Sequence, residues 1–257
     1  MFDITVTLIL HREKAFAIPA LGSMSDLVSV ARAAGLKVEA RAVLDNADDL
    51  TRQIVAVRGG WLDGVEEVSF GDPALSRNQG VLAARGDFLA FLDGDDLWGA
   101  EWLRLAHAAA TAIDAPAEAI WHPESLFCFA EADFDYHTID HCAHPSAQSF
   151  HFLHSPSDEP DFERDVLFLD FLWSANVFAK RSIHLRYPYK AADKRSGFGI
   201  EDWAWNIETV WANISHRVVP NTVHLIRLKE TGSWGKQNTA EGLLPYLLQE
   251  AWPTLGG

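Results

Sequence analysis

The chain has 257 residues, of which 48% are hydrophobic and 22% charged, and its formal net charge is −15. This is enough apolar material for a sizeable core in one large domain. We expect no affinity for nucleic acid, because such binding rests on Lys and Arg neutralising phosphates. The charge also disfavours broad docking on an anionic membrane, but it leaves peripheral association through a local basic patch open. Two cysteines are too few for a disulfide framework.

The first ten residues, MFDITVTLIL, contain neither a basic region nor a small-residue cleavage site. They are typical of a strand rather than a signal peptide. No stretch reaches ~18 uninterrupted apolar residues, so the sequence predicts no transmembrane helix. We therefore expect a cytoplasmic protein, whose oligomeric state the sequence leaves open.

Apolar strand patterns alternate with helical patterns over the first hundred residues. We expect strands at 4–10, 38–44, 65–70 and 88–92, and helices at 25–34, 50–57, 74–85 and 101–113. This alternation predicts an α/β fold with a mainly parallel, Rossmann-like sheet flanked by helices.

The pattern loosens after about residue 114. The region 128–165 is rich in His, Asp, Ser and Pro and predicts loops with short strands. We expect 175–179 to rejoin the sheet, followed by a helix at 200–212, a strand at 218–228 and a docking helix in the tail.

The most informative stretch is GDFLAFLDGDD, residues 86–96. A short apolar strand ends there in Asp93, Asp95 and Asp96, whose mutual repulsion is costly unless a cation or a shared proton relieves it. Carboxylate oxygens suit a hard divalent ion such as Mg²⁺ or Mn²⁺. Ligands of open α/β sheets bind outside the carboxyl ends of strands, where this turn would lie. The alternative is a solvated acidic turn.

The segment from Leu75 to Asp96 resembles the central signature of family 2 glycosyltransferases, which have the GT-A fold. Two further stretches agree with family motifs, VLDNADD at 43–49 and GFGIEDWAW at 197–205. The matching positions of the central signature are Ser76-Arg77-Asn78, Gly80, Ala84-Arg85-Gly86-Asp87, the apolar run 88–92 and Asp93-Gly94-Asp95-Asp96.

The resemblance implies a metal-dependent, inverting transfer of a sugar from a nucleotide-diphospho-sugar to a glycan or other hydroxyl acceptor, with Mn²⁺ or Mg²⁺. At the level of the family it also implies a role in polysaccharide biosynthesis. We expect a single domain over 1–257. Its nucleotide-binding half would be 1–113, its half with the acceptor site and the catalytic base 114–240, and its tail 241–257.

By resemblance, Asp95 is the direct metal ligand, and Asp93 holds the metal through water or the donor's ribose. His224 is a further candidate ligand, although a lone His on a strand is more often structural. Asp96 could bind the metal or, equally well, cap the amino end of the next helix.

The nucleotide-binding candidates are Asp45, for the nucleobase, and Arg77, for the nucleobase or the diphosphate. The structural alternatives are a turn residue and an exposed helix Arg. His11 falls at the end of the first strand, where it can line the pocket. The chain departs from the family there, because His11-Arg12-Glu13 takes the place of the Pro-x-Tyr-Asn that usually follows the first strand. The sequence therefore does not identify the donor's nucleobase.

Asp202 is the candidate general base, since an inverting transfer needs a carboxylate to take the acceptor's proton. Glu201 is the neighbour that would orient the acceptor. Carboxylates at a helix start are also favoured by the helix dipole alone. We expect Trp203, Trp205 and Trp234 to form either an acceptor-sugar platform or part of the core.

Histidines gather between residues 137 and 154, but their spacing does not match a structural zinc site, so we expect a polar loop near the acceptor. They are His137, His141, His144, His151 and His154, with Cys142 among them.

Two other functions fit parts of the pattern. A haloacid-dehalogenase-like phosphatase would use Asp93 as nucleophile and Asp95 as acid, but that family carries its Asp-x-Asp on the first strand. A non-catalytic GT-A-like domain would bind nucleotide or glycan without turnover.

Overall fold

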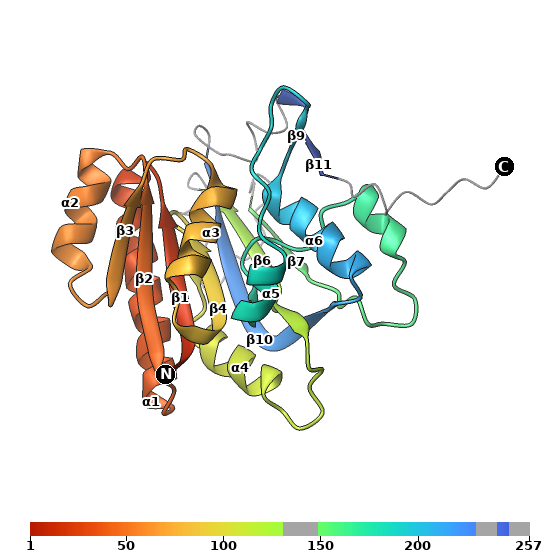
Figure 1. The fold of residues 1–257 in the computed structure, drawn as a ribbon. Helices are drawn as coiled ribbons and strands as arrows, with labels where there is room; N and C mark the ends of the chain where they lie inside the picture. Colours follow the sequence, from red (N-terminus) through yellow and green to blue (C-terminus); the bar gives the residue numbers. More distant parts are fainter. Residues whose placement is uncertain (131–148, 230–240, 247–257) are drawn as a thin grey trace.

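The computed structural model describes residues 1–130, 149–229 and 241–246 (Figure 1). Its central sheet has the strand order β3-β2-β1-β4-β8-β6-β10-β5, and β7 pairs with β6. The strands are β1 Phe2–Leu10, β2 Val38–Asp45, β3 Gly64–Val68, β4 Gly86–Asp93, β5 Leu97–Trp98, β6 Ala119–Ala130, β7 Phe150–Leu153, β8 Phe178–Lys180 and β10 Ser215–Leu228.

The sheet is mixed but mainly parallel. Strands β1 to β4 pair in parallel, as do β6 and β10, whereas β5, β7 and β8 run antiparallel to their neighbours. The predicted α/β class is therefore confirmed, and the carboxyl ends of β1, β2 and β4 share one edge.

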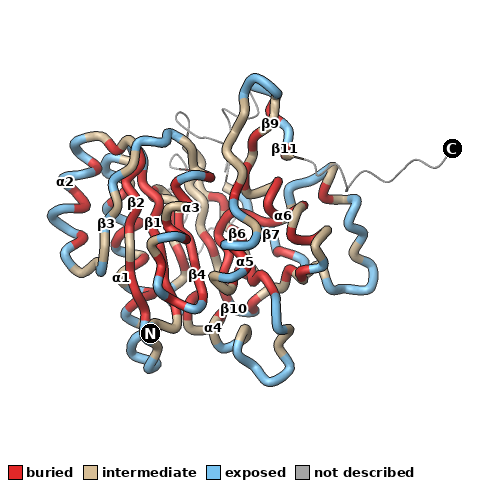
Figure 2. Tube along the Cα trace, viewed as in Figure 1, coloured by how far each residue is buried: buried red, intermediate tan, exposed pale blue. Residues whose placement is uncertain are grey.

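Helices cover both faces of the sheet. Helices α1 and α4 pack on one face with Ile4, Val6 and Leu8, while α3, α5 and α6 pack on the other with Ile9 and Phe91. Figure 2 shows the strands as the most buried part of the chain. Because these strands are buried on both faces, their sequences are continuous apolar runs rather than alternating ones. The helices are α1 Ala17–Ala33, α2 Asp49–Arg58, α3 Pro73–Ala83, α4 Trp102–Ala110, α5 Arg181–Arg186 and α6 Glu201–Trp211.

The start of one helix was predicted wrongly, and one strand was not predicted. Helix α1 begins at Ala17 rather than near residue 25, because Pro19 falls in its first turn, where the missing N–H has no partner to lose. The 12-residue strand β6 was missed. Pro123 lies inside it, and the register with β10 shifts just beyond this residue, between Val219 and Val223.

The histidine-rich region and the tail also differ from expectation where they are described. His151 lies in β7, and His154 is buried, with Nδ1 2.6 Å from the Pro123 carbonyl oxygen. In the tail, Leu244–Pro245 forms strand β11, which pairs with β9, Phe198–Gly199. The other histidines of that region, Cys142 and residues 247–257 lie outside the described residues.

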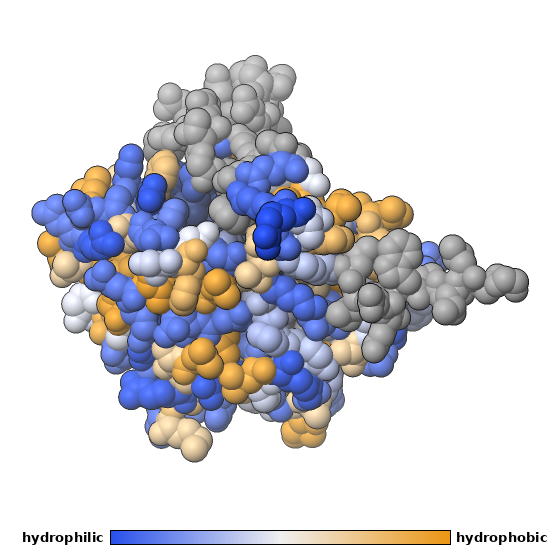
Figure 3. All heavy atoms as spheres, turned by 45° about the horizontal axis from the view of Figure 1, so that its top comes forward, coloured by the Kyte–Doolittle hydropathy of each residue, from blue (hydrophilic) through white to orange (hydrophobic). Residues whose placement is uncertain are grey.

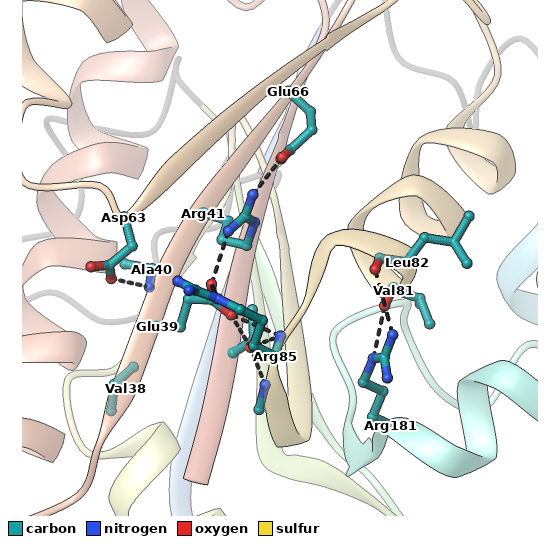
Figure 4. Close-up of polar contacts among 12 residues, drawn as sticks. Val38, Glu39, Ala40, Arg41, Asp63, Glu66, Val81, Leu82, Arg85 and Arg181 are labelled. Atoms are coloured by element: carbon teal, nitrogen blue, oxygen red, sulfur yellow. Dashed lines mark hydrogen bonds and ion pairs between the residues drawn. The ribbon is translucent and has the colours of Figure 1, made fainter. Parts of the chain in front are cut away.

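A polar network fixes the amino ends of the strands (Figure 4). Glu39, at the start of β2, accepts hydrogen bonds from Thr5 Oγ1 at 2.7 Å, from Arg85 Nε at 2.6 Å and from Arg41 Nη1 at 2.8 Å. Arg41 also pairs with Glu66 of β3. One buried carboxylate thus joins β1, β2 and the turn before β4, and through Arg41 it reaches β3.

Hydrophobic side chains form separate patches among hydrophilic ones on the face drawn in Figure 3. None of the helices in the described part of the chain combines the length and the apolar character that crossing a bilayer requires.

Candidate active site at the carboxyl edge of the sheet

A cavity of about 520 Å³ opens at the carboxyl ends of β1, β2 and β4, between the start of α6 and the end of β10. Its size is typical of a small-molecule site. Eight carboxylates line it against three Lys or Arg side chains. Every predicted site residue is among the lining residues, namely His11, Asp45, Arg77, Asp93, Asp95, Glu201, Asp202 and His224.

The acidic turn after β4 lies tightly against β1. A Cβ on Gly94 would lie 2.5 Å from Leu10 Cδ2 and 2.9 Å from the Ile9 carbonyl oxygen, so only glycine fits. The Asp96 amide donates to the Asp93 carbonyl at 3.1 Å and closes the turn. Packing therefore fixes where the carboxylates of this turn emerge.

Asp95 and Asp96 meet the end of β10. Asp96 is buried and accepts from the Arg227 amide at 3.0 Å, and Asp95 pairs with Lys229 Nζ at 2.7 Å. Burial, followed by the charge of Asp93, raises the pKa of Asp96 to about 8. Burial and the neighbouring Asp96 also raise the pKa of Asp95. The turn therefore holds more negative charge than its protein partners balance.

His224 is enclosed by polar side chains. Its Nε2 lies 3.2 Å from Asp96 Oδ2, and its Nδ1 lies 2.8 Å from Asn176 Nδ2 and 3.4 Å from Ser174 Oγ. Burial lowers the pKa of this imidazole to about 3, so it is neutral at ordinary pH. The structure thus places His224 beside the acidic turn, as a metal role requires, but in contact with Asp96 rather than Asp95.

The residue types at the turn fit a hard divalent cation, because carboxylates greatly outnumber cations around the cavity. Among the described residues, no three His, Cys, Asp or Glu side chains are gathered in a metal-binding arrangement. A cation on Asp95 would have to compete with the ion pair to Lys229.

Arg77 joins two parts of the site that are far apart in sequence. Its Nη2 donates to Asp93 Oδ1 at 2.7 Å, and its Nη1 donates to Glu201 Oε1 at 2.5 Å. The side chain is only 2% exposed. Its guanidinium therefore bridges the acidic turn and α6, a role that the sequence did not predict.

Helix α6 begins with the two candidate catalytic carboxylates. Ile200 precedes them with φ 57°, a left-handed conformation that is rare for a β-branched residue and is found mainly at constrained sites. Arg77 engages Glu201, whereas the carboxylate of Asp202 accepts from its own helix, at the Trp203 amide, 2.8 Å away. Burial raises the pKa of Glu201 to about 7 and that of Asp202 to about 6, against the opposing effect of Arg77.

Asp45 organises a loop. Its carboxylate accepts from the amides of residues 70–72 at 2.7, 2.9 and 3.1 Å and from Ser76 Oγ at 2.8 Å. The carbonyl oxygen of Asp45 accepts from His11 Nδ1 at 2.5 Å. A nucleobase contact by Asp45 would have to share a carboxylate that already has four donors.

Sequence reasoning missed Glu13, which lines the cavity beneath the acidic turn. It accepts from the His11 amide at 2.5 Å, and burial, with a smaller contribution from Asp95, raises its pKa to about 7. The signal in the sequence was an acidic residue three positions after β1, within the segment that departs from the family.

The tryptophans separate into different roles. Trp203 lines the cavity, with its indole N–H donated to the Leu167 carbonyl at 2.6 Å. Trp205 is 2% exposed and donates to the Tyr187 carbonyl, so the platform alternative is wrong for this residue. Trp234 lies outside the described residues.

Residues 27–122 match the family described as glycosyl transferase family 2. The match lies within the part of the chain that holds the central signature, and it confirms the predicted resemblance to this family. None of the curated proteins matches the chain.

Solved structures share the GT-A fold at low sequence identity. S. aureus TarS 1-349 in complex with UDP-GlcNAc has 17% identity and a TM-score of 0.59, over 90% of this chain and 60% of that one. Glucosyl-3-phosphoglycerate synthase from Mycobacterium tuberculosis, with Mn²⁺, UDP and phosphoglyceric acid, has 13% identity and a TM-score of 0.56, over 94% and 75%. The mannosyltransferase PcManGT from Pyrobaculum calidifontis, with GDP-Man and Mn²⁺, has 15% identity and a TM-score of 0.57, over 90% and 58%. The chain thus spans about 60% of the TarS fragment's length.

Proposed function

We propose that this chain transfers a sugar from a nucleotide-diphospho-sugar to a hydroxyl acceptor, with inversion at the sugar's C1 and with a divalent cation. One observation carries the proposal. The acidic turn after β4 and the carboxylate pair at the start of α6 line the same cavity, and buried Arg77 links them. A transferase needs this pairing of a donor-phosphate region and a base.

On the donor side, Asp95, Asp93 and His224 are the residues that would hold Mn²⁺ or Mg²⁺. The bound ion would neutralise the charge that develops on the departing diphosphate. His11, Asp45 and Arg77 remain our candidates for shaping the nucleotide site, the last two through the hydrogen bonds described above.

On the acceptor side, Asp202 is the proposed base. As the acceptor oxygen bonds to C1, the bond from C1 to the diphosphate breaks and Asp202 takes the hydroxyl proton. The hydrogen bonds support this division. Arg77 holds Glu201, whereas among the described residues the carboxylate of Asp202 accepts only from its own helix. Trp203 at the cavity wall can stack on the acceptor.

Several finer points belong to the same proposal. Residues 1–113 would bind the nucleotide, and 114–240 would bind the acceptor and carry the base. The solved structures compared above hold UDP-GlcNAc, UDP or GDP-Man, which supports a nucleoside diphosphate as the leaving group. Glycan or polysaccharide synthesis in the cytoplasm stays a prediction from the sequence.

The decisive experiment is thermal unfolding with UDP, GDP and dTDP, each with Mn²⁺ or EDTA, on wild type and Asp95→Ala. We expect one nucleotide to raise the melting temperature of the wild type in the presence of Mn²⁺, because a ligand that binds the native state stabilises it. The shift should disappear in Asp95→Ala. Asp87→Ala is the matched control, since this exposed residue lies on the same strand away from the cavity.

Absence of a shift with every nucleotide would contradict the proposal. Release of phosphate from phosphomonoesters that is lost in Asp93→Asn would favour the phosphatase alternative. Nucleotide binding without any sugar transfer or donor hydrolysis would favour the non-catalytic domain.

A further inference from the structure

Three histidines and a tryptophan pack together against helix α6, and none of them lines the cavity. His122 of β6 and His216 of β10 are hydrogen-bonded to each other, with Nε2 of the first 2.8 Å from Nδ1 of the second. The indole of Trp173 stacks on both rings, with centroid distances of 4.5 Å to His216 and 5.2 Å to His122. The ring centroid of His154 lies 5.8 Å from that of His122. All four side chains are buried.

The hydrogen bonds decide which nitrogen of His216 carries the proton. Thr209 of α6 donates its hydroxyl proton to the Trp205 carbonyl at 2.8 Å, so towards His216 Nε2, 2.9 Å away, it acts as the acceptor. Nε2 of His216 therefore carries the proton, and its bare Nδ1 accepts from His122 Nε2. A second proton, on Nδ1, would remove the acceptor of His122 and leave two N–H groups facing each other. Both bonds of His216 therefore require the neutral ring.

This chain of bonds fastens α6 to the sheet. The bond from His216 to Thr209 joins α6 to β10, and the bond from His122 extends the link to β6. Three further donors on α6 reach carbonyl oxygens outside the strands of the sheet, namely Trp203 to Leu167, Trp205 to Tyr187 and Asn206 to Trp173.

In the described part of the chain, no carboxylate forms an ion pair with His122 or His216. Their titratable neighbour is His154, which in turn feels the charge of His224. Burial lowers the pKa of His216 to about 3 and that of His154 to about 4. The charged groups nearest in sequence to His216 and Thr209 form ion pairs of their own, Arg217 with Asp158 and Glu208 with Lys190.

We propose that His216 is a positioning residue for Asp202, because in its neutral form it holds against the sheet the helix that begins with this carboxylate. Acid breaks the hold, since α6 must separate from β10 before His216 can take up a second proton. The fastening of α6 goes beyond the proposed function, whereas its effect on the transfer of the acceptor's proton rests on that function.

The first test is hydrogen–deuterium exchange of α6 between pH 5 and 8, corrected for the effect of pH on the chemical rate. The closed form binds fewer protons, so acid favours the open form. A histidine that regains its ordinary pKa of 6.5 on opening raises the equilibrium constant for opening about 30-fold from pH 8 to pH 5. We expect this increase in α6 but not in α1, on the opposite face of the sheet. His216→Gln should abolish it, because glutamine can still donate to Thr209 but does not titrate.

His107→Gln is the matched control. His107 is half-buried on α4, its ring centroid lies 5.6 Å from that of Phe88, and burial lowers its pKa as well. Because α4 packs on the opposite face of the sheet from α6, this variant should keep the wild-type pH dependence of exchange in α6.

The second test separates fastening from positioning, with turnover of UDP-GlcNAc and GDP-Man as the readout. It is made at pH 8, where Asp202, whose pKa is raised to about 6, is ionised. His216→Leu removes the bond to α6 and should lower kcat about tenfold or more, with affinity for UDP or GDP within twofold of wild type. His216→Gln should restore most of kcat. If His216→Leu does not fold, as judged by circular dichroism, Thr209→Val removes the same bond from the side of α6.

The outcomes separate the claims. Exchange of α6 that is independent of pH in the wild type, or equally dependent on it in His216→Gln, would overturn the fastening. Faster exchange of α6 with wild-type kcat in His216→Leu or Thr209→Val would overturn the positioning role. If the wild type binds neither nucleotide and consumes neither donor, the proposed function fails and the positioning role with it, while the exchange data still decide whether His216 fastens α6.

Discussion

The two ends of the sheet bury carboxylates in opposite ways. At the amino end, burial alone would raise the pKa of Glu39, but hydrogen bonds from Thr5, Arg85 and Arg41 outweigh it and lower that pKa. At the carboxyl end, burial raises the pKa of Asp96 to about 8 and that of Glu201 to about 7, although Arg227 and Arg77 donate to them.

The difference lies in how the charge of the buried carboxylates is balanced. The donors around Glu39 come from the protein itself. At the carboxyl end the carboxylates share too few cations, so they gain from a proton, a metal ion or a cationic partner. Clustered groups with raised pKa in a cavity are typical of functional sites.

The largest expected effect comes from removing the proposed base. Asp202→Asn should lower the turnover of sugar transfer by about 10²–10⁴, the usual contribution of a general base, and should leave nucleotide affinity unchanged. Initial rates and calorimetry measure the two quantities. Glu208→Gln is the control, because Glu208 lies on the same helix and pairs with Lys190 outside the cavity lining. Equal rates for Asp202→Asn and wild type would show that another group takes the proton.

The next effect concerns the amino end. Glu39→Ala should lower the free energy of unfolding by about 3 kcal/mol, because it removes the buried carboxylate that accepts from Thr5, Arg85 and Arg41 and leaves Arg41 with Glu66 alone. Urea unfolding measures this loss, and nucleotide affinity of the folded variant should not change. Arg85→Met removes a partner that is 59% exposed and should cost about 1 kcal/mol or less. Equal losses in the two variants would mean that the network does not depend on the buried carboxylate.

The smallest effect concerns how the free energy of unfolding depends on pH. Glu201 and Glu39, at opposite ends of the sheet, should contribute to it with opposite signs. The raised pKa of Glu201 means that the folded protein keeps a proton that the unfolded chain loses, so the contribution of Glu201 to stability falls as pH rises from its ordinary pKa of 4.5 to about 7. We expect a fall of about 2 kcal/mol over that window. The contribution of Glu39 is instead present above its ordinary pKa and is lost in acid.

Urea unfolding of ligand-free wild type and Glu201→Gln between pH 5 and 8 isolates this contribution. The variant should lose less stability than the wild type as the pH rises, because it has no carboxylate to ionise. Parallel curves for the two proteins would contradict the raised pKa.

Local patterns in the sequence determined the alternation of strands and helices, the acidic turn after 88–92 and the carboxylates at the start of α6. Each of these features depends on residues close together in the sequence, because hydrophobic periodicity and turn propensity are local properties. The same reasoning missed β6 and the start of α1, because a proline that usually interrupts such elements is tolerated at those two positions.

Only the tertiary structure decided which distant groups meet. Arg77 reaches Glu201, 124 positions away in sequence, and the guanidinium of Arg227 lies over the rings of Phe16 and Phe129. Spacing along the chain carries no information about such contacts, because the crossovers of the sheet set them. The sequence by itself thus determined which chemical groups the carboxyl edge carries. The packing of the strands decided which of these groups form ion pairs and which line the cavity.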